Sequence, residues 1–203
     1  RHTVAVGNDA GAYWNPAKGQ QHEGGAVFVG GGAGRYAGTA ASPICIGRNA
    51  GQASSSSPMS GAHNLCIGSR SLEKVSSGSN NTAVGGNYAA LFVQTGSWNV
   101  FMGSLAGYGY DTTNACQSGN YCTQIGGYTK SSGASNDYES CFGYGITGKG
   151  ANTTHIRGSA YNSNNSSSWS TTSDERIKKN IVDNNIGLDA IEKIRVRNFE
   201  YRT

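Results

Sequence analysis

The sequence predicts an all-β protein built from short stacked repeats, and both its composition and a recurring four-residue unit indicate this class. Of 203 residues, 31 are Gly and only 3 are Pro, and charged residues make up 14%. Disordered chains are usually rich in charge and Pro, and collagen needs Gly at every third position, so both classes are excluded. Residues 1–172 are also poor in the Ala, Leu, Glu and Lys that favour helical bundles. An ordered, turn-rich β architecture remains.

The recurring unit consists of three mostly apolar or small residues followed by Gly. It occurs nine times, and the intervals between successive glycines range from 15 to 23 residues. The copies are Val4–Gly7, Val27–Gly30, Ile44–Gly47, Leu65–Gly68, Thr82–Gly85, Val100–Gly103, Thr123–Gly126, Ser140–Gly143 and the weaker His155–Gly158.

Each copy has the length of one short strand, and its Gly allows a turn that a Cβ would obstruct. Because a three-residue strand buries no face alone, the copies must stack, either along one chain or with three chains side by side. The residue before the Gly is apolar in the first eight copies. We therefore expect that position to form the buried column, with the variable intervals as loops on the outside. A Gly-rich sandwich with irregular strands is the alternative.

One stretch, Ser-Asn-Asn-Thr-Ala-Val-Gly from Ser79 to Gly85, resembles the repeats of phage tail fibres and, more distantly, the head repeats of trimeric autotransporter adhesins. The resemblance covers residues 3–160. It implies a homotrimeric shaft or head in which the repeats form a trimeric β-solenoid or β-prism fibre. It also implies a host surface receptor (a glycan or an outer-membrane protein) and other tail proteins as partners. The expected location is the virion, after assembly in the host cytoplasm.

The charge distribution predicts a domain boundary near residue 173. Residues 173–203 carry 13 charged side chains in 31 positions, whereas residues 1–172 carry 15 in all. We therefore assign residues 1–160 to the Gly-rich repeat domain and residues 161–172 to a Ser- and Asn-rich linker. Residues 173–203 form a short α+β segment, with apolar residues at helical spacing in 187–194 and a strand-like pattern in 195–202.

The start of that segment, Ser173-Asp174-x-Arg176-x-Lys178, resembles the start of the peptidase S74 domain, the intramolecular chaperone of tail fibres, tailspikes and endosialidases. The resemblance implies a domain that assists trimerisation and then cleaves itself off just before the Ser. Carried over, Ser173 is the nucleophile, Lys178 is the base, and the scissile bond joins Thr172 to Ser173. Asp174 and Arg176 are candidates for supporting roles.

The residue types suit this single-turnover chemistry. A Ser hydroxyl attacks efficiently only when a base removes its proton, and a Lys serves as that base when its pKa is depressed. Domains of this family are longer than the 31 residues present, so we expect the chain to be a fragment. A helix start is the alternative, because Thr172 followed three residues later by Glu175 makes an acceptable capping box.

Aromatic residues in the longer loops between repeats are the candidate receptor contacts, since aromatic rings offer their faces to sugars or to protein partners at low entropic cost. Packing between loops and adjacent chains of a trimer is the alternative. The longest intervals, 7–30 and 103–126, are the expected receptor-facing regions. The candidates are Tyr13, Trp14, Tyr108, Tyr110 and Tyr121.

Other chemistries find little support. The four His residues are not at metal-ligand spacing, so we expect neither a metal nor another cofactor. No basic run suits nucleic acid, and no apolar run approaches the length for membrane insertion. Five Cys residues exclude a complete disulfide framework within one chain. Three of them, Cys45, Cys66 and Cys141, are expected as small buried hydrophobes, while Cys116 and Cys122 form a disulfide or remain free thiols.

The sequence thus predicts a homotrimeric, receptor-binding tail fibre protein whose last residues begin a self-processing chaperone. A polysaccharide-degrading tailspike is an alternative. It requires two suitably spaced carboxylates, and residues 1–172 offer only six in no recognisable motif. A bacterial trimeric adhesin head is the other alternative, and it requires a membrane anchor.

Overall fold

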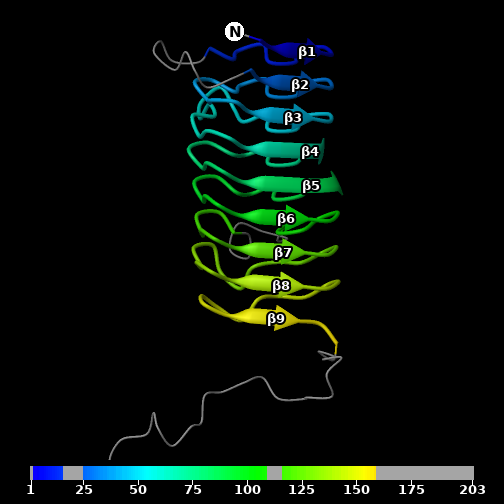
Figure 1. The fold of residues 1–203 in the computed structure, drawn as a ribbon, viewed down its shortest axis with the longest axis vertical. Coiled ribbons are helices and arrows are strands. Elements are labelled where there is room, and N and C mark those ends of the chain that lie inside the picture. Colours follow the sequence, from blue (N-terminus) through cyan, green and yellow to red (C-terminus); the bar gives the residue numbers. More distant parts are fainter. Residues whose placement is uncertain (1, 16–24, 109–115, 159–203) are drawn as a thin grey trace, which may run out of the picture. The chain divides into compact units, whose positions relative to one another are not determined.

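The computed structural model describes residues 2–15, 25–108 and 116–158. In these ranges the chain is a parallel β-solenoid in which nine short strands form one sheet, each paired with the next in sequence (Figure 1). The all-β repeat prediction is therefore confirmed. The strands are β1 (Val4–Val6), β2 (Val27–Val29), β3 (Ile44–Ile46), β4 (Leu65–Ser69), β5 (Thr82–Asn87), β6 (Val100–Met102), β7 (Thr123–Ile125), β8 (Ser140–Phe142) and β9 (Thr154–Ile156).

The strands coincide with the nine repeat copies, and their register follows the repeat. In β2 and β3, for example, Val27 pairs with Ile44 and Phe28 pairs with Cys45. The parallel pairing means that each interval between copies is one coil of the solenoid, which returns the chain to the start of the next strand. The described part of one chain therefore builds its own solenoid without strands from a second chain.

By contacts, the chain divides into two units, Arg1–Ala160 and Tyr161–Thr203. The second unit lies outside the described residues. The linker 161–172, the helix expected at 187–194 and the strand expected at 195–202 therefore stay predictions.

The buried column is the second residue of each strand from β2 to β8, and the prediction that it is the residue before the Gly was wrong. In the end strands β1 and β9, the corresponding residues Ala5 and His155 are exposed and half-buried, respectively. Side chains alternate between the two faces of a strand, so in a three-residue strand only the middle one points into the coil. The residues before the Gly point outward, and Val6, Met102 and Ile125 are 58%, 45% and 37% exposed. The fully buried middle residues are Phe28, Cys45, Cys66, Ala83, Phe101, Gln124 and Cys141.

A second glycine, four residues after the first, makes room for the large core residues. The ring of Phe28 lies against Gly11 of one coil and Gly34 of the next, and a Cβ at Gly11 would lie 2.6 Å from that ring. In the coil of β4, where the buried strand residue is the smaller Cys66, Leu72 stands at the second glycine's position and is completely buried. The coil of β3 keeps a glycine there, Gly51, beside Cys45 and Cys66. The large rings therefore depend on the second glycine, and Leu72 fills space in a coil that has no such ring.

Buried polar side chains form another column, immediately before the strands. Asn64, Asn81 and Asn99 are each 1% exposed or less. The side-chain amide of Asn81 donates to Asn64 Oδ1 (3.1 Å), and that of Asn99 donates to Asn81 Oδ1 (3.0 Å). Each amide also donates to a backbone oxygen of the next coil, as Asn81 does to Gly96 (2.8 Å). This ladder satisfies polar groups that would otherwise be buried without partners.

The same column ends in a buried carboxylate. Glu139 precedes β8 and is completely buried. It accepts hydrogen bonds from the Ser131 hydroxyl, the Ser132 hydroxyl (2.7 Å) and the Gly150 backbone N–H (2.8 Å). Burial raises the pKa of Glu139, but these hydrogen bonds outweigh it and the pKa of this carboxyl lies below its ordinary value.

Candidate functional site

The outer face of the sheet is an uninterrupted row of strand residues along the described solenoid. It consists of the first and third residues of β1 to β9, and no charged residue stands among these eighteen. Fourteen are apolar, and the four polar ones are Thr82, Thr123, Ser140 and Thr154. With neighbouring strands about 4.8 Å apart, this stripe is roughly 40 Å long. We call it the sheet face.

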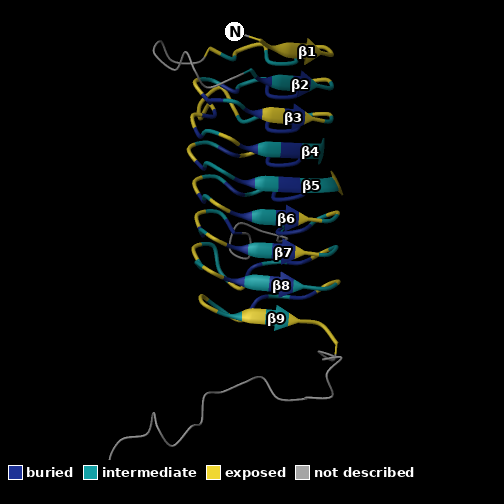
Figure 2. Cartoon of the chain, in the orientation of Figure 1, coloured by how far each residue is buried: buried dark blue, intermediate teal, exposed yellow. Residues whose placement is uncertain are grey.

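The sheet face is partly open to solvent along its length. Val4 is 52% exposed, Ile44 and Ile46 are each 37% exposed, and Ile156 near the other end is 40% exposed. Figure 2 shows intermediate or exposed strand residues from β1 to β9. Extended apolar patches of this kind mark interaction surfaces in soluble proteins. The parallel sheets of globular proteins usually have both faces covered.

A pocket of about 350 Å³ lies beside the predicted receptor residue Tyr13. Its lining consists of Tyr13, Tyr36, Gly38, Ser55 and Pro58. The rings of Tyr13 and Tyr36 stack with centroids 5.0 Å apart and planes 7° from parallel. Tyr13 is 58% exposed, so this pair offers an accessible aromatic wall beside a serine hydroxyl.

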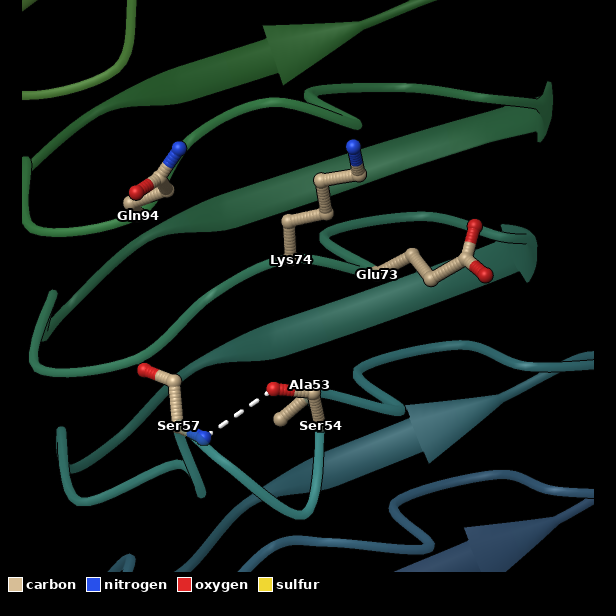
Figure 3. A pocket seen from close by; sticks show the side chains of 6 residues that line it. All are labelled: Ala53, Ser54, Ser57, Glu73, Lys74 and Gln94. Atoms are coloured by element: carbon tan, nitrogen blue, oxygen red, sulfur yellow. Dashed lines mark hydrogen bonds between the residues drawn. The ribbon is translucent and has the colours of Figure 1, made fainter.

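A second pocket, of about 330 Å³, is lined in part by other residues of the same serine-rich loop (Figure 3). Ala53, Ser54, Ser57, Glu73, Lys74 and Gln94 line it. Its polar groups already have partners. Glu73 pairs with Arg70, the ammonium of Lys74 lies 4.6 Å from the centre of the Phe92 ring, and Gln94 donates to Gln117 (3.2 Å). The Ser57 N–H donates to Ser54 Oγ (3.0 Å), so the loop is internally tied.

The remaining receptor candidates lie in different environments. Trp14 packs edge-on against Phe28, and its indole N–H donates to the Ala40 carbonyl (3.0 Å), which gives it a place in the core. Tyr108 is half-buried and contacts Tyr88 and Phe92. Tyr121 is 48% exposed. Tyr110 lies outside the described residues. The structure therefore does not gather the four described candidates into one site.

Sequence reasoning missed three aromatic residues related to those candidates, of which Trp98 and Tyr138 are exposed and Tyr36 is half-buried. Tyr36 stacks on Tyr13, and Tyr138 stacks on Tyr121 with centroids 4.8 Å apart. Trp98 occupies the equivalent place one coil before Tyr121, two residues ahead of its strand. Aligning the coils on their glycines would have placed these residues in common columns.

The carboxylates of the described residues do not form the pair that glycoside hydrolysis requires. Glu73 is the only carboxylate lining the second pocket, and the first pocket has none. Asp9 pairs with Arg35 (3.6 Å), Asp137 accepts from the Asn120 backbone (2.7 Å), and Glu139 is buried in the column described above. The described surface thus offers no support for the tailspike alternative.

All five cysteines are free thiols and buried, as expected for Cys45, Cys66 and Cys141. A hydrogen bond with Cys45 and burial raise the pKa of Cys66, and burial together with Glu139 raises the pKa of Cys141 to about 12. Both groups are therefore protonated and unreactive at neutral pH. Cys116 and Cys122 lie close together, and their mutual hydrogen bond raises the pKa of the first and lowers that of the second.

The catalytic candidates Ser173 and Lys178, their supporting residues Asp174 and Arg176, and the bond between Thr172 and Ser173 lie outside the described residues. Within the described ranges, no group of His, Cys, Asp and Glu has the arrangement of a metal site. Those ranges likewise contain no helix with the length and apolarity to cross a membrane.

Comparisons with protein-family models, with curated proteins and with solved structures yield no match for this chain.

Proposed function

We propose that this protein is a structural component of a phage tail fibre, a homotrimer that binds a receptor on the host surface. The sheet face is the observation that carries the proposal. It is a long, uncharged and largely apolar stripe that stays partly open to solvent, although the chain buries a core inside its own coils. The resemblance of the Ser79–Gly85 stretch to fibre repeats supports the same function.

Burial of this face between copies of the chain stabilises the assembly through the hydrophobic effect, which a single chain with an open face lacks. Each buried Å² of apolar surface contributes about 25 cal/mol, and the face extends over all nine strands. Three chains that turn this face toward a common axis cover all three stripes at once. Two chains would cover their sheet faces completely only if both faces were flat, but sheets of parallel strands are twisted. A three-fold prism of solenoids, each folded from its own chain, is the arrangement we favour.

Receptor contacts belong on the surfaces that such a prism leaves open. The pocket beside Tyr13 and Tyr36 is our leading candidate, because it combines an exposed aromatic wall with the Ser55 hydroxyl. The partner is a glycan or an outer-membrane protein of the host. The C-terminal segment acts in assembly, and other tail proteins connect the fibre to the virion.

The oligomeric state of the purified protein tests the proposal. Size-exclusion chromatography with light scattering should give three times the chain mass of 21.1 kDa. Ile46→Lys and Ile125→Lys place a cation on the sheet face, where it is hydrated in one chain but desolvated between chains. Each variant should shift the protein to monomers with an unchanged β-type circular dichroism spectrum. Ser56→Lys, in an exposed loop, is the matched control and should remain trimeric. A monomeric wild-type protein would refute the proposal.

A further inference from the structure

Three large aromatic residues form a column along one border of the sheet face. Trp98, Tyr121 and Tyr138 each stand two residues before a strand, on the consecutive coils that lead into β6, β7 and β8. They are 57%, 48% and 54% exposed. Backbone hydrogen bonds hold these coils in register, from Tyr121 to Ser97 (3.1 Å) and from Tyr138 to Asn120 (2.9 Å). We call these three residues the aromatic border.

The backbone at the aromatic border is in the left-handed region, which suits asparagine better than an aromatic residue. The φ angles are 61° at Trp98, 58° at Tyr121 and 57° at Tyr138. At the equivalent places on other coils, Asn80 and Asn152 have φ of 58° and 60°. Bulky residues adopt this conformation at a cost, and exposed rings add unburied apolar surface. Within the described part of one chain, the interaction that offsets this cost is the stacking of Tyr121 on Tyr138.

The geometry points to a second copy of this chain as the partner of the aromatic border. We propose that, in the homotrimer, it packs against the carboxyl ends of the neighbouring chain's strands. There the neighbour presents Met102, Ile125, Tyr128 and Tyr144, all of them exposed. This inference rests on the homotrimer proposed above.

Cyclic symmetry requires this pairing of unlike ends. When three sheets face a common axis with their strands running in the same rotational sense, the start of each strand meets the end of a strand in the next chain. Figure 1 shows the nine strands running in one direction, so all starts lie at one border of the sheet and all ends at the other. The contact is therefore heterologous and closes as a ring.

The surface areas fit a protein contact. Aromatic side chains bury 150–250 Å² each, so three rings that are about half exposed offer roughly 300 Å². Together with the sheet face, this exceeds the few hundred Å² of contiguous apolar surface that monomeric proteins usually expose. Each border residue stands two positions before its strand and is separated from the first sheet-face residue by one buried residue, so the aromatic border adjoins the sheet face along the chain.

The stacking geometry favours a protein partner over a sugar. The planes of Tyr121 and Tyr138 are 10° from parallel at a centroid distance of 4.8 Å. Each of these two rings therefore covers one face of the other, which leaves fewer open aromatic faces along the border. A sugar ring needs an open aromatic face, whereas aromatic edges pack readily against methionine, isoleucine and tyrosine side chains.

Light-driven dityrosine cross-linking of mixed trimers tests the contact. Unlabelled and ¹⁵N-labelled chains are refolded together, the trimeric mass is verified, and cross-linked peptides are identified by mass spectrometry. Peptide pairs of mixed isotope come from two different chains. We expect mixed pairs that join Tyr121 or Tyr138 to Tyr128 or Tyr144. If a verified trimer gives mixed pairs only between other tyrosines, or no mixed pairs at all, the proposed contact is wrong while the homotrimer is still supported. A protein that never forms trimers overturns both.

Asparagine substitutions provide a second measurement, since the backbone conformation there accepts asparagine. Trp98→Asn and Tyr138→Asn should leave the folding of the single chain intact. Each should raise the protein concentration at half-assembly by about tenfold or more, as for a central aromatic contact. Tyr13→Asn removes an equally exposed ring that belongs neither to the aromatic border nor to the sheet face. It is the control for assembly alone, which it should not change. Unchanged assembly in the border variants, with loss of binding to immobilised host glycans instead, would assign the aromatic border to ligand recognition.

Discussion

At the scale of single residues, the first glycine of each repeat allows neighbouring coils to approach closely. Gly30 has φ of +126°, and a Cβ placed there would lie 2.7 Å from the carbonyl carbon of Gly47 on the next coil. Neither the backbone angle nor the distance tolerates a side chain. The same relation recurs between Gly47 and Gly68, where the distance would be 2.6 Å. The sequence predicted this role correctly, because a turn that recurs with Gly at every copy indicates a steric requirement.

The substitution Gly30→Ala should destabilise the solenoid by about 2–4 kcal/mol, through backbone strain and collision with the next coil. Gly31→Ala is the matched control. Its Cβ would have the Asn8 carbonyl oxygen as its nearest contact at 4.0 Å, and its φ lies outside the left-handed range. We expect a change within about 0.5 kcal/mol there. Chemical denaturation followed by circular dichroism measures both, and equal effects would contradict this account of the turn.

At the scale of elements, the sequence predicted the strands but not which of their residues is buried. The apolar residues before the glycines are more regular than the middle ones, which vary from Ala to Phe and include Gln124. The regular apolar residues therefore belong to the sheet face, whereas the residue type at each core position depends on the size of the side chains around it. Phe28 needs Gly34 beside it, while Cys66 goes with Leu72. Such compensation depends on contacts across a coil, which periodicity along the chain does not reveal.

The buried column before the strands was also invisible in the sequence, because it changes chemistry from coil to coil. It passes from Asn99 through Cys122, whose backbone N–H donates to Asn99 Oδ1 (2.7 Å), to Glu139. Polar residues in a Ser- and Asn-rich chain predict loops rather than a core ladder. Burial there depends on the stacking of coils, so it follows from the fold and not from the residue type.

The carboxylate of Glu139 makes the stability of this column depend on pH. Its pKa is depressed in the folded chain, so its contribution is fully present above the unfolded value of about 4.3 and is lost as the pH falls through the folded pKa. Glu139→Gln should cost about 2–4 kcal/mol at pH 7, because several donors lose a charged acceptor. This difference should shrink as the pH falls below about 4.

Denaturation midpoints at pH 7, 5 and 3 check this expectation. Asp9→Asn removes the same charge at a site that is 42% exposed in its side chain and is the control for a general charge effect. A difference between Glu139→Gln and the wild type that stays constant across the three pH values would show that the carboxylate is not ionised in the folded protein.

At the scale of the whole molecule, the solenoid and the C-terminal segment have separate tasks in the proposed fibre. A stack of coils has a low barrier to pairing with the wrong copy, because each coil presents nearly the same edge and face as the next. An assembly domain that holds three chains in register before the solenoids associate prevents such slippage. In the proposed fibre that domain would be dispensable once the sheet faces are buried, which would give the proposed self-cleavage at the junction a physical purpose.

Removal of the segment should therefore follow trimerisation and should require Ser173 and Lys178. The protein is expressed at its natural full length, and intact mass and oligomeric state are measured for the wild type, Ser173→Ala and Lys178→Ala. We expect wild-type trimers of chains that end at Thr172, and uncut trimers for both variants. Lys179→Ala, next to the proposed base, is the control and should still be cut. An uncut wild type, or cleavage that persists in Ser173→Ala, would show that Ser173 and Lys178 do not perform the reaction. The measured mass of the assembly tests the trimer independently of cleavage.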